Sequence, residues 1–459
     1  MRSSLAVSSH VLIMHFKIKR LMKILKFGGT SVGSATSIRN VKDIISAEEG
    51  EKIIVLSAMS GVTNLLVQII AELKAGRTEN AEVIVKQLRK KHLALVEDLI
   101  PFENFPVKDQ VIRQFEKLSE ILHEDHSENA EARILTFGEV VSTFIVSKYF
   151  ENEGIASTLL DARKFMHVSN IENPDTNKVG RLLDQYLRDK TKTGVYITQG
   201  FVRVDKFNRI NTLKRGGSDY TATILGAAVE ATEIQIWTDI DGFHNNDPRF
   251  VENTHPLTHL TFEEAAELAY FGAKILHPQT VSPVIGKNIP IYLKNTFTPE
   301  TQGTMISSTV THRGLKAISA KDGITAIKIK SNRMLMAHGF LKKIFEVFDR
   351  LETSIDMITT SEIAISLTID DTKNLDEIVE ALKDYGQITV ETNHSIICVV
   401  GEGLIEENNT SRIFEILKEI PVRMISYGGS INNVSLLVAT ENKVATLRAL
   451  HSKLFEMVT

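Results

Sequence analysis

Cysteine and long apolar runs are what this sequence most lacks. Cys398 is its only cysteine, so neither a disulfide framework nor a thiolate zinc site can form within one chain. No apolar run reaches the ~18 residues that a membrane-spanning helix needs. The 53 basic and 57 acidic residues leave a net charge of −4, which gives no signal for nucleic-acid binding. We therefore expect neither a membrane nor a nucleic acid as a partner.

The chain is long enough to form several hydrophobic cores. Its 459 residues, 43% apolar and 24% charged, predict a globular protein of roughly three domains. Residues 1–21 include an apolar patch interrupted by His10 and His15, and no small-residue cleavage site follows it. We interpret this segment as a dispensable extension rather than a signal peptide. Met22 is then the functional start, and we expect a cytoplasmic protein.

A glycine turn near the start of the chain, within Lys23–Gly33, is the first candidate site. An alternating apolar run predicts a strand that ends at Gly28 and Gly29, and helical spacing follows. Such a turn brings bare backbone N–H groups to a bound anion at the positive end of a helix. Lys26 adds a mobile positive charge, and no nucleotide P-loop motif follows. By itself, a turn of this kind is more often purely structural.

Small hydroxyl residues follow the next predicted strand, 52–57. Ser57 and Thr63 lie where ligands collect in open α/β sheets, so they are candidates for binding a small polar substrate. The structural alternative is that Thr63 or Asn64 caps the following helix. The two interpretations are compatible.

A carboxylate stands at the head of a later helix. Glu139 follows Gly138 and precedes an apolar helical stripe, so the helix dipole alone could explain it. The functional interpretation is a fixed anion that receives a substrate ammonium group. The histidine- and acid-rich stretch 121–127 is read as a charged helix end, because no matching ligand set follows; we predict no metal site there.

A second glycine turn occurs at Gly216 and Gly217, after a strand at 194–201 and a β-hairpin at 203–210. Arg215 supplies a bidentate fork that suits a carboxylate or phosphate. Ser218 or Asp219 is predicted to cap a helix of small residues. Two such turns in one domain are much less easily explained as accident.

A third polar segment follows the strand 233–240, which ends in Thr238 and Asp239. The loop 241–249 is rich in hydrogen-bonding groups and ends in Arg249, so it favours ligand contact over a plain surface loop. Thr261 and Glu264 form a capping-box pattern. Lys274 follows that helix, where an ordinary solvated lysine is the alternative. A strand at 289–293 then ends the domain, and residues 294–314 are predicted to be a linker.

The remainder of the chain contains two units with the same order of elements. Each is predicted as strand, helix, strand, strand and helix, the first over 324–385 and the second over 395–455. Units of roughly 70 residues in this ferredoxin-like order imply two similar small domains. Such pairs pack edge to edge and form small-ligand sites at their interfaces.

Six stretches, taken in order, resemble the motifs of aspartate kinases: Lys26–Val32, Val55–Asn64, Arg215–Asp219, Trp237–Asp239, Asp247–Arg249 and Phe271–Lys274. The resemblance covers nearly the whole chain from Met22 onward. It implies an α/β fold, with an amino-acid-kinase αβα sandwich over 22–300. Two ferredoxin-like α+β ACT domains would follow, over 315–393 and 394–459, with 315–322 as a candidate strand of the second.

The resemblance implies an activity. Such an enzyme transfers the γ-phosphoryl group of ATP to the β-carboxylate of L-aspartate, giving 4-phospho-L-aspartate, the first step of lysine, methionine and threonine biosynthesis. Mg²⁺ would bridge the ATP phosphates. No general base is needed, because the attacking carboxylate is ionised at neutral pH. A monofunctional form is implied, since the chain ends at Thr459, before a fused homoserine dehydrogenase would begin.

The resemblance also implies roles for individual residues. Lys26 would stabilise the transferring phosphoryl group, and Asp219 would organise Lys26 or complete the aspartate pocket. Aspartate contacts are implied for Ser57, Thr63, Glu139, Arg215, Gly216, Gly217 and Ser218. ATP contacts are implied for Lys26, Gly28, Gly29, Thr238, Asp239, His244, Arg249 and Lys274. His244 stands where relatives commonly carry a tyrosine.

An effector site is implied in the first ACT domain. Its residues would be Met336, Gly339, Phe340, Leu341, Asp356 and Ser361, binding an end-product amino acid that inhibits the enzyme. Met336 lies where lysine-inhibited relatives can have a histidine, so lysine and threonine both stay open as the effector. A homodimer or homotetramer formed through the ACT domains is expected.

The sequence disfavours two alternative functions. Kinases of another amino acid, such as glutamate, lack the Ser57 and Thr63 arrangement and the paired ACT modules. A non-enzymatic amino-acid sensor with a degenerate kinase half is disfavoured by the presence of Lys26, Glu139, Arg215 and Asp219.

Overall fold

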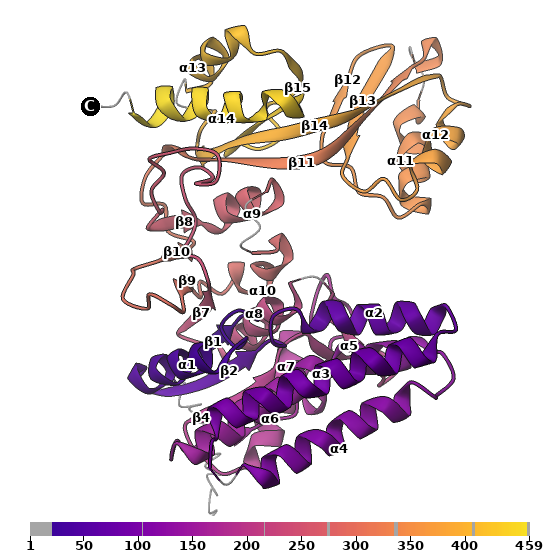
Figure 1. Ribbon diagram of the computed structural model, residues 1–459. Helices are drawn as coiled ribbons and strands as arrows, with labels where there is room; N and C mark the ends of the chain where they lie inside the picture. The colour runs from indigo at the N-terminus through magenta and orange to yellow at the C-terminus, as the bar shows by residue number, and fades with distance from the viewer. Residues whose placement is uncertain are drawn as a thin grey trace, which may run out of the picture.

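The computed structural model describes residues 21–102, 104–214, 216–272, 276–334, 338–405 and 409–456. Figure 1 shows a larger N-terminal half and a smaller C-terminal half, each built on its own sheet. Helix α9 (Phe262–Tyr270) lies between the two halves.

Eight strands form the N-terminal sheet. Their order across the sheet is β3 (Thr158–Leu159), β4 (Val195–Gln199), β2 (Glu51–Leu56), β1 (Met22–Phe27), β7 (Glu233–Thr238), β9 (Ile291–Asn295), β10 (Thr304–Ser307) and β8 (His259–Thr261). Neighbouring strands are parallel except β9 and β10, which are antiparallel. The carboxyl ends of β1, β2, β4, β7 and β9 therefore lie along one edge.

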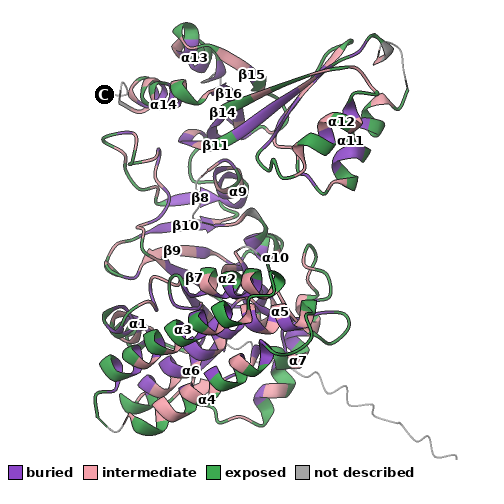
Figure 2. Ribbon diagram, turned by 45° about the vertical axis from the view of Figure 1, so that its right-hand side comes forward, coloured by how far each residue is buried: buried purple, intermediate pink, exposed green. Residues whose placement is uncertain are grey.

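The sheet is buried on both faces, as its nearly continuous apolar strands require. Along β1, Ile24 joins one hydrophobic core while Leu25 and Phe27 join the other. The first core is covered by α7 (Thr176–Arg188), α8 (Gly217–Val229), α9 and α10 (Ser282–Ile285). The second is covered by α1 (Ala35–Ala47), α2 (Val62–Lys74), α3 (Thr78–Leu99), α4 (Phe105–Ile121), α5 (Glu128–Leu135) and α6 (Phe137–Asn152). Figure 2 shows this burial, and the predicted αβα sandwich is confirmed.

Several local predictions are confirmed and others are wrong. The hairpin forms from β5 (Val202–Val204) and β6 (Ile210–Thr212), and the capping box opens α9. The predicted linker 294–314 instead contains β10, because its apolar Ile306 is buried between β9 and β8.

The predicted side-chain caps of α2 and α8 are also wrong. Glycines occupy both N-cap positions, Gly61 and Gly216, with φ of 80° and 69°. Thr63, Asn64, Ser218 and Asp219 therefore lie within the first turns of these helices, where their side chains are not used as caps.

Six antiparallel strands form the C-terminal sheet. Their order is β12 (Ile358–Thr360), β13 (Ala364–Ile369), β11 (Gly314–Lys330), β14 (Gln387–Glu402), β16 (Asn433–Ala439) and β15 (Val422–Ser426). Helices α11 (Phe340–Arg350) and α12 (Leu375–Leu382) cover one end of the sheet. Helices α13 (Asn409–Ile416) and α14 (Lys443–His451) cover the other.

The two central strands run through both units, which periodicity alone did not predict. Ile327 and Ile329 of β11 join the core beneath α11 and α12, whereas Ile318 joins the core beneath α13 and α14. Residues 315–321 pair with 396–401 of β14. We therefore propose that 315–322 complete the second unit, so that the first unit is inserted within it.

Among the described residues, no helix is both long and apolar enough to cross a membrane.

Candidate active site

The carboxyl ends of the central parallel strands bring the predicted motifs together. The N–H of Gly28 donates to the carbonyl of Trp237 (3.1 Å), which joins the first glycine turn to the end of β7. The N–H of Ser57 donates to the carbonyl of Phe27 (3.2 Å), so the turn after β2 lies beside the same glycines. Three motifs far apart in sequence thus meet at one edge, as expected for a ligand site in an α/β sheet.

A cleft of about 400 Å³, here called the sheet-edge cleft, opens at this edge. Predicted site residues line it: Lys26, Gly29, Ser57, Thr63, Glu139, Gly216, Gly217, Ser218 and Asp219. Gly28 lies in the adjoining turn, and Arg215 lies outside the described residues. The structure therefore gathers most of the predicted phosphoryl and substrate residues into one cavity.

Lys26 and Asp219, the two residues predicted to be catalytic, form an ion pair. Lys26 Nζ lies 2.5 Å from Asp219 Oδ1, although the residues come from β1 and the first turn of α8. Only 8% of Lys26 is exposed, so its ammonium group is held in place rather than moving freely in water. A fixed cation of this kind can neutralise negative charge that develops on a transferring group.

The backbone at Gly216 requires glycine. Its φ of 69° lies in the left-handed region, and a Cβ there would sit 2.7 Å from Cβ of His277. A side chain at this position would be strained and would collide with the segment that follows α9. The second glycine turn is thus packed closely against that segment.

Glu139 is a buried carboxylate that forms no ion pair with any residue in the described part of the chain. It lies in the first turn of α6, is 4% exposed, and its Oε2 has no hydrogen-bond partner among the described residues. Burial raises its pKa to about 8, against the opposing effect of backbone hydrogen bonds. A buried charge is normally paired, so the orphaned oxygen in a cleft points to a cationic ligand group.

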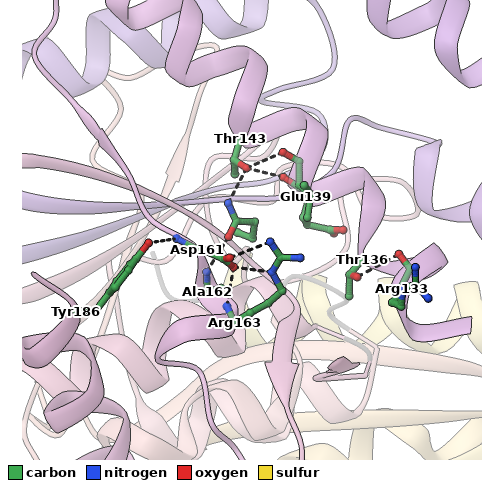
Figure 3. Close-up of polar contacts among 10 residues, drawn as sticks. Arg133, Thr136, Glu139, Thr143, Asp161, Ala162, Arg163 and Tyr186 are labelled. Atoms are coloured by element: carbon green, nitrogen blue, oxygen red, sulfur yellow. Dashed lines mark hydrogen bonds and ion pairs between the residues drawn. The ribbon is translucent and has the colours of Figure 1, made fainter. Parts of the chain in front are cut away.

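Hydrogen bonds hold the Glu139 helix in position. Thr143 Oγ1 donates to the Glu139 carbonyl (2.8 Å) and accepts from Gln199 Nε2 (2.9 Å) at the end of β4. Gln199 Oε1 accepts in turn from the N–H of Ala162 (2.9 Å). Figure 3 shows the Glu139 carboxylate directed away from these contacts. They fix the helix and leave the carboxylate available.

A second cavity of about 570 Å³, here called the interdomain cleft, lies between the two halves. Asp219 and Gly216 line both clefts, so the two cavities adjoin at the second glycine turn. Arg249 lines the interdomain cleft as well. Its guanidinium group pairs with Asp247, which holds the pKa of that carboxyl below its usual value.

Three other residues predicted to bind the nucleotide, Thr238, Asp239 and His244, line neither cleft. Thr238 Oγ1 donates to Asp239 Oδ1 (3.1 Å) directly after β7. His244 bonds Asp241 Oδ1 through Nε2 (2.9 Å) and Thr254 Oγ1 through Nδ1 (3.2 Å). Lys274 lies outside the described residues.

The predicted effector residues are spread over the first C-terminal unit. Gly339 is the N-cap of α11, with φ of 77°, and Phe340 and Leu341 begin that helix. Asp356 precedes β12 and Ser361 follows it, where its N–H donates to the Ala364 carbonyl (2.8 Å). Met336 lies outside the described residues.

Sequence reasoning missed several residues that line these clefts, of which four are informative. Lys214 and Phe201 line the sheet-edge cleft, and both have positive φ, 62° and 67°. Lys214 precedes Arg215 in the sequence, and this pair of basic residues could have indicated that Lys214 also lies at the site. Tyr270 and Lys321 line the interdomain cleft from different halves, so no local pattern could have linked them.

Comparison with known proteins identifies the class first. Residues 22–295 match the model of the amino acid kinase family, and residues 397–454 match an ACT domain model. The first match covers both glycine turns and every strand of the N-terminal sheet except β10, and the second lies in the C-terminal half.

Full-length relatives identify the particular family. The lysine-sensitive aspartokinase 3 of Escherichia coli is 31% identical over 94% of this chain and 99% of its own length. The chloroplastic aspartokinase 1 of Arabidopsis thaliana is 34% identical over 95% of this chain and 81% of its own. The crystal structure of E. coli aspartokinase III with aspartate and ADP superposes with a TM-score of 0.83, at 30% identity, covering 95% of this chain and 100% of that one.

The chain therefore belongs to the aspartokinases. Its reaction is the ATP-dependent phosphorylation of the β-carboxylate of L-aspartate, which opens the biosynthesis of lysine, methionine and threonine. The alternatives of a glutamate kinase and of a degenerate sensor are disfavoured by the same matches.

Proposed function

We propose that the sheet-edge cleft binds L-aspartate and that phosphoryl transfer occurs beside Lys26. The observation that carries this proposal is the orphaned, buried Glu139 carboxylate facing the same cavity as the Lys26–Asp219 pair. Glu139 would receive the substrate ammonium group. The Arg215–Gly217 turn would bind the α-carboxylate, and Ser57, Thr63 and Ser218 would supply hydrogen bonds.

The reaction then needs positioning and charge neutralisation more than acid–base chemistry. The β-carboxylate of aspartate is ionised at neutral pH and attacks the γ-phosphorus directly. The bond from that phosphorus to the bridging oxygen of ADP breaks as the new bond forms. Lys26, fixed by Asp219, would neutralise the charge on the transferring group, and the N–H groups of Gly28 and Gly29 would approach it without side-chain obstruction.

ATP is the phosphoryl donor, and we assign its contacts to Thr238, Asp239, His244, Arg249 and Lys274. Mg²⁺ would arrive on the ATP phosphates, since this ion keeps most of its waters and is commonly held by phosphates plus one or two carboxylates. Asp219, the carboxylate shared by both clefts, would be a candidate protein ligand for that ion.

We also propose feedback inhibition by an end-product amino acid at Met336, Gly339–Leu341, Asp356 and Ser361. The lysine-sensitive relative favours lysine over threonine as the effector. A homodimer or homotetramer formed through the C-terminal sheets and a cytoplasmic location complete the proposal.

One assay tests the catalytic assignment. ATP-dependent acyl phosphate is trapped as a hydroxamate, with aspartate and glutamate compared as substrates. We expect product with aspartate, and Lys26→Ala should lower kcat by roughly a hundredfold to a thousandfold with little change in nucleotide affinity. Lys383→Ala, an exposed lysine beyond α12, is the matched control and should be fully active.

Two outcomes would contradict the proposal. An unchanged kcat in Lys26→Ala would remove that residue from the reaction. Equal or greater turnover with glutamate would show that the Glu139 cleft does not select aspartate.

A further inference from the structure

One face of α9 is tied to the C-terminal sheet along its whole length. Glu264, Glu267 and Tyr270 recur every three residues, so they share one side of the helix. Figure 1 shows α9 directly beneath β11 and β14. Each of the three side chains contacts a different part of the C-terminal half.

The first contact is a buried ion pair. Glu264 Oε2 accepts from Lys316 Nζ of β11 at 2.8 Å, with side-chain exposures of 0% and 6%. The same oxygen accepts from the N–H of Thr261 (2.8 Å), which completes the capping box. The start of α9 is thus fixed to the sheet by a pair that water does not reach.

The second and third contacts follow at successive turns. Glu267 accepts a hydrogen bond from Asn433 of β16. Tyr270 donates its hydroxyl to Asp356 Oδ1 at 2.9 Å, and burial together with the nearby Asp356 carboxylate raises the pKa of that phenol. The end of the helix is therefore held by a carboxylate just before β12.

The Tyr270 contact is part of a small charged cluster. Lys321 Nζ lies 2.7 Å from the same Asp356 oxygen, 2.8 Å from Asp370 and 4.6 Å from the centre of the Tyr270 ring. Lys321 thus has a second acceptor within the C-terminal half. The Tyr270 hydroxyl is the member of the cluster that belongs to the kinase half.

Two described residues after Tyr270, Gly272 and His277, also contact the neighbouring elements. Gly272 has φ of 116°, and a Cβ there would lie 1.8 Å from the Ala320 carbonyl of β11, so the backbone presses on the sheet. His277 then packs against Gly216, the glycine shared by both clefts. A shift at the end of α9 would reach the interdomain cleft through these two contacts.

We propose that this face of α9 is a latch through which the C-terminal sheet positions the interdomain cleft for ATP, and that Tyr270 is its positioning residue. The inference rests on the proposed nucleotide role of Arg249 in that cleft. Because Asp356 is also a proposed effector contact, one carboxylate would serve both the latch and the effector site. Removing the Tyr270 hydroxyl should weaken ATP binding and leave aspartate binding intact.

Steady-state kinetics of the full chain test the latch. Tyr270→Phe should raise KM for ATP about threefold to tenfold, with kcat and KM for aspartate unchanged. Asp356→Asn should act in the same direction, and the double variant should be no worse than the more severe single variant, because both remove one contact. Tyr427→Phe, an exposed tyrosine of the second unit, is the control and should match the wild type.

Arg249→Ala separates failure of the latch from failure of the nucleotide assignment. If Arg249→Ala leaves KM for ATP unchanged, the assigned nucleotide residues are wrong. If Arg249→Ala raises it and Tyr270→Phe does not, the latch is wrong and the nucleotide assignment stands. Additive effects of Tyr270→Phe and Asp356→Asn would likewise contradict a shared contact.

Discussion

Glu139 and Glu264 are the same residue type in the same local setting, the first turn of a helix, and both are buried. Glu264 accepts from the Thr261 backbone and from Lys316, so its charge is matched within the protein. Each carboxylate has one oxygen without a hydrogen bond among the described residues, Oε2 in Glu139 and Oε1 in Glu264, but only Glu139 lacks a cationic partner there. The two glutamates therefore differ in charge pairing: Lys316 matches Glu264, whereas we propose that a substrate cation matches Glu139.

The difference also explains why helix position alone is a poor guide to function. The helix dipole favours both carboxylates to a similar degree, by a fraction of a kcal/mol up to about 2 kcal/mol. Burial without a partner disfavours the ionised form far more, and this raises the pKa of Glu139 to about 8. We propose that the substrate ammonium group stabilises the ionised form of Glu139 when it binds.

The largest expected effect is on stability at Glu264. Glu264→Gln removes one charge of a buried pair and leaves Lys316 uncompensated, so the free energy of unfolding should fall by about 3 to 5 kcal/mol. Urea denaturation measures this. A loss below the error of the measurement would mean that water reaches Lys316 and that the pair contributes little.

The same substitution at Glu139 should raise the free energy of unfolding rather than lower it. The folded pKa of about 8 lies above the unfolded value of 4.5, so folding binds a proton between these pH values. Wild-type stability should therefore fall by roughly 1.4 kcal/mol per unit as pH rises through that window, relative to Glu139→Gln. The variant should be the more stable by on the order of 3 kcal/mol at pH 7. Parallel unfolding curves at pH 5 and pH 8 check the slope, and identical slopes would contradict the assigned burial.

Although Glu139→Gln should be more stable than the wild type, it should be less active. Glu139→Gln removes the partner of the substrate ammonium group, so kcat/KM for aspartate should fall by roughly a hundredfold. In the wild type, kcat/KM for aspartate should rise with pH up to about 8, because the free enzyme must lose the Glu139 proton before the ammonium group binds. The variant should lack that rise. A similar pH profile in both proteins would assign the titration to another group.

The smallest expected effect concerns Lys214, on the rim of the same cleft. Its φ of 62° places a non-glycine residue in the left-handed region, at a cost of order 1 kcal/mol. Lys214→Gly should raise the free energy of unfolding by about 1 kcal/mol. Glu230→Gly, at a left-handed helix C-cap away from both clefts, provides a comparison. A destabilised Lys214→Gly variant would show that the lysine side chain contributes more than its backbone strain costs.

Much of the fold could be predicted because local sequence patterns determine it. Alternating apolar residues, paired glycines and the Thr261–Glu264 box act within a few positions, so strands, turns and helix starts followed from sequence. The caps of α2 and α8 were wrong for a local reason, because Gly61 and Gly216 occupy the N-cap positions. The other errors arose where a distant partner decided the outcome. Residues 304–307 became a strand because β9 and β8 flank them, and β11 runs through two units because β14 pairs along most of its length.

The sequence by itself determined which chemical groups this aspartokinase has and in what order they occur: a glycine turn beside Lys26, a second turn at Gly216, and a carboxylate at the head of α6. Only the tertiary structure decided their partners. The pairing of Lys26 with Asp219 and Glu264 with Lys316, the isolation of Glu139, and the contact of Tyr270 with Asp356 join residues from separate elements. Local backbone preferences reach only a few residues along the chain, whereas burial and charge pairing depend on which surfaces pack together.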